Sequence, residues 1–198
     1  MKALRILGGV LKGFPLPPIK EDIVRPTAVM LRRKVFDSHQ NFEGITFYDL
    51  FAGSGAMGLE AWSRGAKAVY LVENNPRVMK NLKIILEKIQ NSFQEQLEQR
   101  PIIIVNQSAQ RFIIGKASFF KGEELVYLDP PYEHKNLYTQ SLNSLAQSKY
   151  RGKLWLESCE NKGESLKYWE EYASSLGCSV SKHYSAGSKY ISVYDFGL

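Results

Sequence analysis

Short apolar runs alternate with longer amphipathic stretches along most of the chain. The β-branched and aromatic residues of these runs predict buried strands at residues 45–48, 68–73, 102–105, 125–128 and 153–157. The spacing of apolar positions between them predicts helices at residues 59–64, 75–89, 137–147 and 166–176. Strands that alternate with helices favour an α/β fold, with a mostly parallel sheet covered by helices on both faces.

The second half of this pattern contains clear start and stop signals. Asn75 is a good N-cap, and Pro76 suits the first position of the helix that follows. Gly65 is a plausible stop for the helix at 59–64. Further along, the β-rich runs 179–184 and 189–196 predict a hairpin beside the parallel strands.

The N-terminal part has a different pattern. The runs 5–7 and 10–12 flank a Gly-Gly pair, which predicts a short hairpin, and the prolines that follow predict an extended connection. Thr27 is a good N-cap for a helix to about residue 37. We therefore expect a hairpin and extended arm over residues 1–24, and the main domain over residues 25–198.

Composition narrows the class of protein. The chain has 198 residues, 44% hydrophobic and 23% charged, which is enough for one globular domain with a sizeable core. Cys159 and Cys178 lack the spacing of a metal or redox site, which favours a reducing compartment. We see no membrane-spanning run and no signal-peptide pattern. These observations predict a cytoplasmic monomer with no metal and no membrane partner.

The charge balance permits nucleic-acid binding without requiring it. Lys and Arg number 26 against 20 for Asp and Glu, a net charge of +6. The candidate phosphate contacts on the arm and the first helix are Arg5, Lys12, Arg25, Arg32 and Arg33. The alternative is that these side chains only form solvated faces, and charge alone does not decide between the two.

A glycine-rich turn links the strand at 45–48 to the helix at 59–64. Residues 49–58 read DLFAGSGAMG, so a ligand can approach the backbone closely at a helix N-terminus. The GxGxxG spacing alone is a weak dinucleotide signal. Glu73 ends the next strand, at the spacing where an acidic side chain holds ribose hydroxyls. The structural alternative is a tight turn with no ligand.

Two cofactors fit this turn, a nicotinamide dinucleotide and S-adenosylmethionine. Asp49 lies four residues before the first glycine, where it faces the floor of the pocket. A carboxylate there suits the cationic amine of a methionine moiety and would repel a pyrophosphate. The sequence therefore favours S-adenosylmethionine.

A second motif follows the strand at 125–128. Residues 129–132 read DPPY. This motif resembles the Asp/Asn-Pro-Pro-Tyr loop of the amino-methyltransferases, which holds the target amine. A nucleobase amine is a poor nucleophile, and acceptors for its hydrogens turn its lone pair toward a methyl donor. The carboxylate of Asp129 and the carbonyl of Pro130 are such acceptors, and Pro130 and Pro131 stiffen the loop. We expect Asp129 to be the acceptor and proton sink, and Tyr132 to stack on the base. The structural alternative is a surface turn.

Taken together, these residues resemble the amino-methyltransferases. The segments RILGG, KG, RPT with a following RxxF helix, DLFAGSGAMGLEA and DPPY are similar to the bacterial 16S rRNA guanine-N2 methyltransferase family RsmD, over nearly the whole chain. The resemblance implies a Rossmann-like class I fold with a seven-stranded sheet, S-adenosylmethionine as cofactor, and 16S rRNA as partner within a small-subunit assembly particle.

The resemblance also implies a set of cofactor residues. These are Thr27, Asp49, Phe51, Ala52, Gly53, Ser54, Gly55, Glu73, Asn74, Gln107, Ser108 and Ala109. The family usually has an Asp after the strand at 102–105 to hold adenine N6, but this chain reads NQSA there. Gln107 or Ser108 could replace it, or the contact could be to the backbone only. Arg33 stands where the family usually has Glu, and the hairpin carries fewer basic residues.

Three other functions compete with this one. The DPPY motif also fits a DNA adenine or cytosine amino-methyltransferase, although the chain leaves no room for a domain that reads DNA sequence. A non-catalytic rRNA-binding assembly factor would not need Asp49, Gly53, Gly55, Glu73 and Asp129, all of which are present. A nicotinamide oxidoreductase is the remaining alternative.

Overall fold

The computed structural model describes residues 4–17, 26–116, 120, 122 and 124–197. Its strands are β1 (Leu4–Arg5), β2 (Pro15–Leu16), β3 (Thr46–Asp49), β4 (Ala68–Glu73), β5 (Ile102–Asn106), β6 (Glu124–Leu128), β7 (Lys153–Cys159), β8 (Cys178–Ala186) and β9 (Lys189–Phe196). Its helices are α1 (Pro26–Ser38), α2 (Ala56–Ser63), α3 (Pro76–Gln99), α4 (Ala109–Lys116), α5 (Lys135–Gln147) and α6 (Leu166–Ser175).

Seven of the strands form one sheet in the order β5-β4-β3-β6-β7-β9-β8. The pairs from β5 to β7 are parallel, and β9 is antiparallel to both of its neighbours. This arrangement confirms the predicted mostly parallel sheet and the hairpin beside it. Because β4 and β6 flank β3 on opposite sides, the chain reverses its direction of winding there, and ligands bind at such a point.

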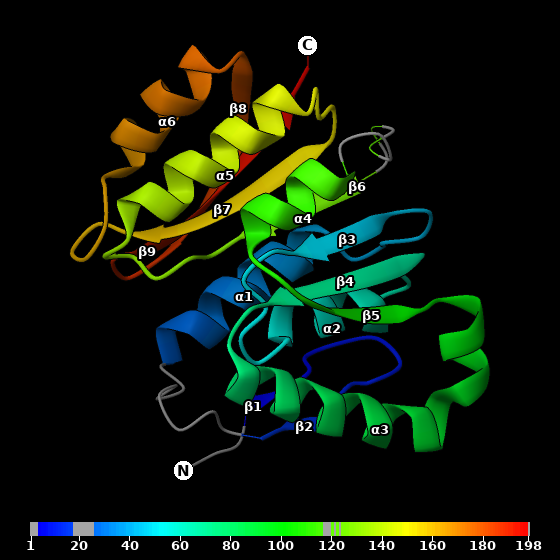
Figure 1. Cartoon of the computed structure of the whole chain (residues 1–198). Helices are drawn as coiled ribbons and strands as arrows, with labels where there is room; N and C mark the ends of the chain where they lie inside the picture. Colours follow the sequence, from blue (N-terminus) through cyan, green and yellow to red (C-terminus); the bar gives the residue numbers. More distant parts are fainter. Residues whose placement is uncertain (1–3, 18–25, 117–119, 121, 123, 198) are drawn as a thin grey trace.

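Helices cover both faces of this sheet (Figure 1). One apolar core contains side chains of α1, α2 and α3, and a second contains side chains of α4, α5 and α6. Buried parallel strands are apolar on both faces, which is why the runs in β3, β4 and β6 were readable in the sequence. The predicted doubly covered fold is therefore confirmed.

The ends of the helices follow local chemistry. Asn75 Oδ1 accepts a hydrogen bond from the Arg77 amide at 2.9 Å, as expected of the N-cap of α3. Gly65 follows the C-cap of α2 with a φ of 102°, a conformation that favours glycine. α3 continues to Gln99 past a kink at Phe93, beyond the predicted end of its apolar stripe.

The predicted N-terminal hairpin is confirmed, but the predicted turn at the Gly-Gly pair is wrong. β1 pairs with β2, so the hairpin is wider, and the loop between them contacts the end of α2 instead. The amides of Leu7 and Gly8 donate to the buried carboxylate of Glu60 at 2.7 and 2.8 Å. At Gly9 an added Cβ would lie 1.8 Å from the Ser63 carbonyl oxygen. The glycines therefore permit close contact with α2.

This N-terminal segment shares its core with the main domain. Ile6, Leu11 and Leu16 are at most 2% exposed and belong to the core that α1, α2 and α3 form. α1 begins at Pro26, so Thr27 lies in its first turn and not at its cap. The side chain of Thr27 lies outside the described part of the structure.

Candidate active site

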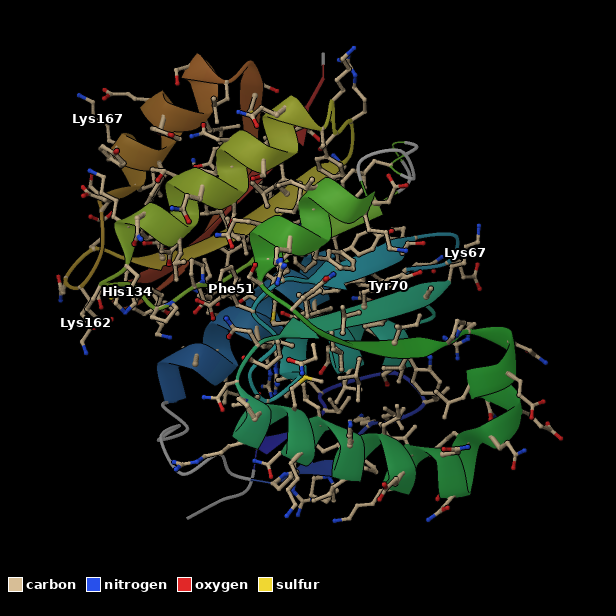
Figure 2. The ribbon with its side chains drawn as sticks, in the orientation of Figure 1. Phe51, Lys67, Tyr70, His134, Lys162 and Lys167 are labelled. Atoms are coloured by element: carbon tan, nitrogen blue, oxygen red, sulfur yellow. The ribbon has the colours of Figure 1, made fainter. Side chains whose placement is uncertain are left out.

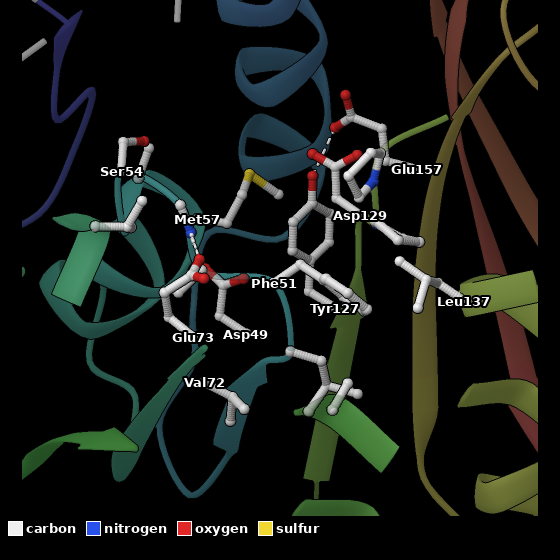
Figure 3. A pocket seen from close by; sticks show the side chains of 18 of the residues that line it. Asp49, Phe51, Ser54, Met57, Val72, Glu73, Tyr127, Asp129, Leu137 and Glu157 are labelled. Atoms are coloured by element: carbon white, nitrogen blue, oxygen red, sulfur yellow. Dashed lines mark hydrogen bonds between the residues drawn. The ribbon is translucent and has the colours of Figure 1, made fainter. Parts of the chain in front are cut away.

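A cavity of about 900 Å³ opens at the carboxyl ends of β3, β4 and β6 (Figure 3). Most of the residues predicted to hold the cofactor line it: Asp49, Phe51, Ala52, Gly53, Ser54, Glu73, Asn74, Gln107, Ser108 and Ala109. All four residues of the DPPY loop line it as well: Asp129, Pro130, Pro131 and Tyr132. The fold thus brings both predicted motifs to one cavity.

The glycine turn is shaped by backbone conformation and by close packing. Gly53 and Gly55 have φ angles of 49° and 73°, in the left-handed region that favours glycine. Gly55 is the N-cap of α2. A Cβ on Gly58 would lie 2.4 Å from the Leu71 side chain, so α2 packs tightly on β4. Each of these three positions therefore favours glycine for a structural reason of its own.

Asp49 is a buried carboxylate with one unused oxygen. Its Oδ2 accepts a hydrogen bond from the Gly58 amide at 3.1 Å, whereas Oδ1 has no partner among the described residues. Burial is the main cause that raises the pKa of Asp49 to about 7, and the Glu73 charge adds to it. A buried, unpaired carboxylate oxygen at a cavity wall fits a cationic group of a ligand.

Glu73 ties the end of β4 to the glycine turn. Its Oε1 accepts from the amides of Asn74 and Asn75 at 2.9 and 2.8 Å, and its Oε2 accepts from the Gly53 amide at 3.2 Å. Figure 3 shows Glu73 beside Asp49. A carboxylate has about four acceptor positions, so about one stays open on Oε2. That position suits one ribose hydroxyl.

The far end of the cavity is formed by the start of α4, a helix that sequence reasoning missed. Ser108 Oγ accepts a weak hydrogen bond from the Arg111 amide at 3.4 Å, which engages it in the first turn of α4. Phe112 and Ile113 bury the helix against the sheet. In the sequence, the serine before this apolar pair could have indicated the start of α4. Both predicted replacements for the family Asp, Gln107 and Ser108, line the cavity.

The DPPY loop is held by its neighbours. The Tyr138 hydroxyl donates to the Pro130 carbonyl at 3.0 Å, and the His134 amide donates to the Pro131 carbonyl at 2.9 Å. Burial and the nearby charge of Glu157 raise the pKa of Asp129 well above its usual range. A carbonyl has two lone pairs, so Pro130 can still accept one more hydrogen.

Glu157 of β7 is a cavity residue that sequence reasoning missed. It accepts hydrogen bonds from the hydroxyls of Tyr127 and Tyr132 at 2.6 and 2.8 Å, and Lys189 Nζ lies 3.2 Å from its Oε1. The same ammonium lies 5.0 Å from the centre of the Tyr132 ring. In the sequence, a charged residue within the apolar run of β7 could have indicated a functional side chain. These contacts anchor Tyr132 at its hydroxyl and cover one face of its ring.

The rim of the cavity lies on the loops after β6 and β7. Figure 2 shows His134 and Lys162 on these loops, at one side of the molecule, whereas Phe51 lies toward the middle. Lys162 lines the cavity and lies 4.0 Å from Glu133. His134 is exposed just before α5. The DPPY loop therefore faces solvent on one side.

The predicted basic residues have different surroundings. Arg5, Lys12 and Arg33 are exposed, whereas Arg25 lies outside the described residues. For Arg32, predicted as a phosphate contact, the alternative of a solvated face does not hold. Arg32 is 5% exposed, donates to the Arg5 carbonyl at 2.6 Å and lines the cavity, and burial lowers its pKa. α1 is covered by the N-terminal segment at this position, which removes Arg32 from solvent.

Other features of the described residues bear on the class of protein. Within that part of the chain, no group of three or more His, Cys, Asp or Glu side chains is arranged to hold a metal ion. No helix in the same ranges has both the length and the apolar character needed to cross a bilayer. Cys159 and Cys178 are buried free thiols.

The sheet order and the position of the cavity place the chain in the Rossmann-like class of methyltransferase folds. It belongs to the RsmD family, since the family model described as "Conserved hypothetical protein 95" matches residues 4–193. It is 32% identical to "Ribosomal RNA small subunit methyltransferase D" of Haemophilus influenzae over 152 residues, 74% of this chain and 72% of the relative.

Solved structures share the fold. The Escherichia coli protein yhhF superposes with a TM-score of 0.73 at 24% identity, over 98% of both chains. A SAM-dependent methyltransferase from Agrobacterium tumefaciens superposes with a TM-score of 0.62 at 15% identity, over 91% of this chain and 66% of the other. At these identities the likeness concerns the fold alone.

Proposed function

We propose that this protein transfers a methyl group from S-adenosylmethionine to the exocyclic N2 amine of a guanine in 16S rRNA. The observation that carries the proposal is the meeting of two sites in one cavity: a buried carboxylate with an open oxygen at Asp49, and the acceptor loop at Asp129. Membership of the RsmD family and the name of the Haemophilus influenzae relative support rRNA as substrate.

The residues of the glycine turn fit the proposed cofactor. Asp49 Oδ1 would take the methionine ammonium, and the open position on Glu73 Oε2 would take a ribose hydroxyl. Gln107 would accept from the adenine amine, with Phe51 and Ala109 beside the ring. When bound, S-adenosylmethionine supplies a methyl group on a sulfonium, which is an electrophile for nitrogen.

The DPPY loop prepares the amine. Asp129 accepts one amine hydrogen and the Pro130 carbonyl accepts the other, which turns the nitrogen lone pair out of the plane of the base. As positive charge grows on the nitrogen, the Asp129 carboxylate stabilises it and then takes the released proton. Tyr132 stacks on the extruded base with the ring face that Lys189 leaves open. Tyr138 keeps the Pro130 carbonyl in place.

The substrate particle is part of the proposal. Arg5, Lys12 and Arg33 would contact RNA phosphates from the exposed surface of the N-terminal segment and α1. Small-subunit assembly particles are the expected substrate, and the cytoplasm is the expected place of action. We expect the enzyme to work as a monomer.

Labelled methyl transfer tests the proposal. The protein is incubated with tritiated S-adenosylmethionine and with naked 16S rRNA, small subunits or duplex DNA, and the modified base is mapped. We expect label on guanine N2 of RNA. Label on DNA adenine or cytosine would indicate the DNA enzyme. Binding of S-adenosylhomocysteine without transfer to any of these substrates would indicate an assembly factor.

Asp129 variants separate chemistry from binding in the same assay. Asp129→Ala should slow single-turnover transfer by about 10²–10³-fold, the loss that follows removal of one preorganised polar group. Affinity for S-adenosylhomocysteine should stay within a few-fold, and Asp129→Asn should lose less because its amide oxygen still accepts. Glu95→Ala, an exposed change on α3, is the matched control. A rate for Asp129→Ala close to that of the parent would place the acceptor elsewhere.

A further inference from the structure

The cavity contains a second carboxylate beside Asp129 that the reaction described above does not use. Glu157 is 7% exposed and lines the same cavity as Asp129. We propose that Glu157 determines the base: it accepts the N1–H of the target guanine, next to the amine that Asp129 holds. This inference rests on the proposed function and adds the residue that selects guanine over adenine and cytosine.

The position of Glu157 follows from the register of the sheet. β6 and β7 are parallel, and Leu128 pairs with Leu156. Asp129 directly follows β6, and Glu157 is the next residue of β7, so the two carboxylates lie at neighbouring positions near the carboxyl ends of these strands. Figure 3 shows both beside the Tyr127 hydroxyl. Two acceptors therefore lie side by side where a base edge would enter.

The contacts of Glu157 make it an acceptor toward the cavity. Three donors already point at it: the hydroxyls of Tyr127 and Tyr132 and the ammonium of Lys189, at 2.6, 2.8 and 3.2 Å. Of about four acceptor positions, three are used, and the open one lies on Oε2. That oxygen can take one more hydrogen.

Tyr132 connects this carboxylate to the base. Its hydroxyl points at Glu157 Oε1, so a base stacked on the ring has one edge above the Glu157 carboxylate. That edge also holds the amine, because Asp129 is the neighbouring acceptor. The two carboxylates thus face two adjacent positions on one edge of the base.

The three bases with exocyclic amines differ at that adjacent position. In guanine, N2 lies between N3, an acceptor, and N1–H, a donor, so the Watson–Crick edge presents two neighbouring donors. In adenine and cytosine the ring nitrogen next to the amine is an acceptor, which would face the Glu157 carboxylate lone pair to lone pair. A buried acceptor left unpaired in this way weakens binding and excludes the wrong base. Two neighbouring donors also relieve the repulsion between the two carboxylates.

The test compares two bases at the mapped target position. One RNA carries guanine, and the other carries 2-aminopurine, which keeps the amine but has an acceptor at N1. The parent enzyme should prefer guanine by at least about tenfold in kcat/KM, the scale of one hydrogen bond to a charged group. If the parent enzyme methylates the two RNAs at equal rates, that result alone overturns the inference, and no variant is needed.

The variant Glu157→Gln tests the residue itself. Its amide keeps the size of the carboxylate and can donate to an N1 acceptor, so the preference for guanine over 2-aminopurine should fall at least tenfold. Glu171→Gln, an exposed change on α6, should keep the parent ratio. A merely structural role for Glu157 would lower both rates and leave the ratio unchanged, which would refute the assignment. A parent enzyme that methylates no guanine would instead refute the proposed function.

Discussion

Replacing Asp49 by Asn should weaken cofactor binding and stabilise the cofactor-free protein. The change keeps the size of the side chain and an oxygen for the Gly58 amide, but it removes the charge. The unpaired Oδ1 offers one charge-assisted hydrogen bond to a ligand ammonium, worth roughly 1.5–3 kcal/mol. Affinity for S-adenosylhomocysteine at pH 8 should therefore fall roughly 10- to 150-fold.

The same carboxylate makes this affinity depend on pH. With a pKa of about 7, Asp49 is mostly protonated at pH 6 and mostly ionised at pH 8. Because a ligand ammonium needs the ionised form, the affinity of the parent should rise about tenfold from pH 6 to pH 8. Asp49→Asn has no carboxylate to ionise at this position, so its affinity should change much less with pH.

Ionisation of Asp49 favours ligand binding but lowers the stability of the protein without ligand. Burial raises the folded pKa of Asp49 from 3.8 to about 7, so the folded state holds the proton more tightly than the unfolded state. As the pH rises from about 4 to 7, the unfolded chain releases this proton first, and the parent loses up to about 4 kcal/mol of stability. Asp49→Asn escapes this loss and should be the more stable protein at pH 8.

Calorimetry with S-adenosylhomocysteine and urea unfolding without ligand, both at pH 6 and pH 8, measure these effects. Glu95→Gln is the matched control, because it removes an exposed carboxylate on α3. A variant that binds within threefold of the parent at pH 8, with an unchanged pH profile, would refute the role of Asp49 in holding the ligand amine.

Two further predictions concern packing and RNA. Gly58→Ala should lower the free energy of unfolding by about 1–3 kcal/mol, because the new methyl would lie 2.4 Å from Leu71. Urea unfolding measures this change. Gly115→Ala is the control and should not destabilise the protein, because the space at its Cβ is open. The double change of Lys12 and Arg33 to Gln should reduce the salt dependence of RNA binding by about one unit of logarithmic slope per lost phosphate contact. An unchanged slope would assign both side chains to a solvated surface.

The sheet and the glycine turn could be predicted because their signals are local. Continuous apolar runs mark buried parallel strands, and Asn75 with Pro76 marks the start of α3. Parallel strands have their carboxyl ends at one edge, so motifs that follow β3 and β6 had to meet. The placement of Asp49 and Asp129 in one cavity followed from topology.

The features that could not be predicted depend on contacts between distant segments. The width of the N-terminal hairpin is set by Glu60, which lies more than 50 residues away and accepts from its loop. Arg32 is buried because that same segment covers α1. Glu157 and Lys189 come together through the antiparallel pairing of β7 with β9. Spacing along the chain carries no information about such pairs.

The place of β9 in the sheet has a consequence for how the protein is made. β9 follows the other six strands of the sheet in the chain, yet it lies between β7 and β8. Among the described strands β8 pairs with β9 alone, so β8 joins the sheet only through β9, and β7 exposes an unpaired edge until β9 inserts. Lys189, at the start of β9, arrives with that insertion. The insertion of β9 therefore completes the sheet and brings the ammonium beside Glu157 at the same time.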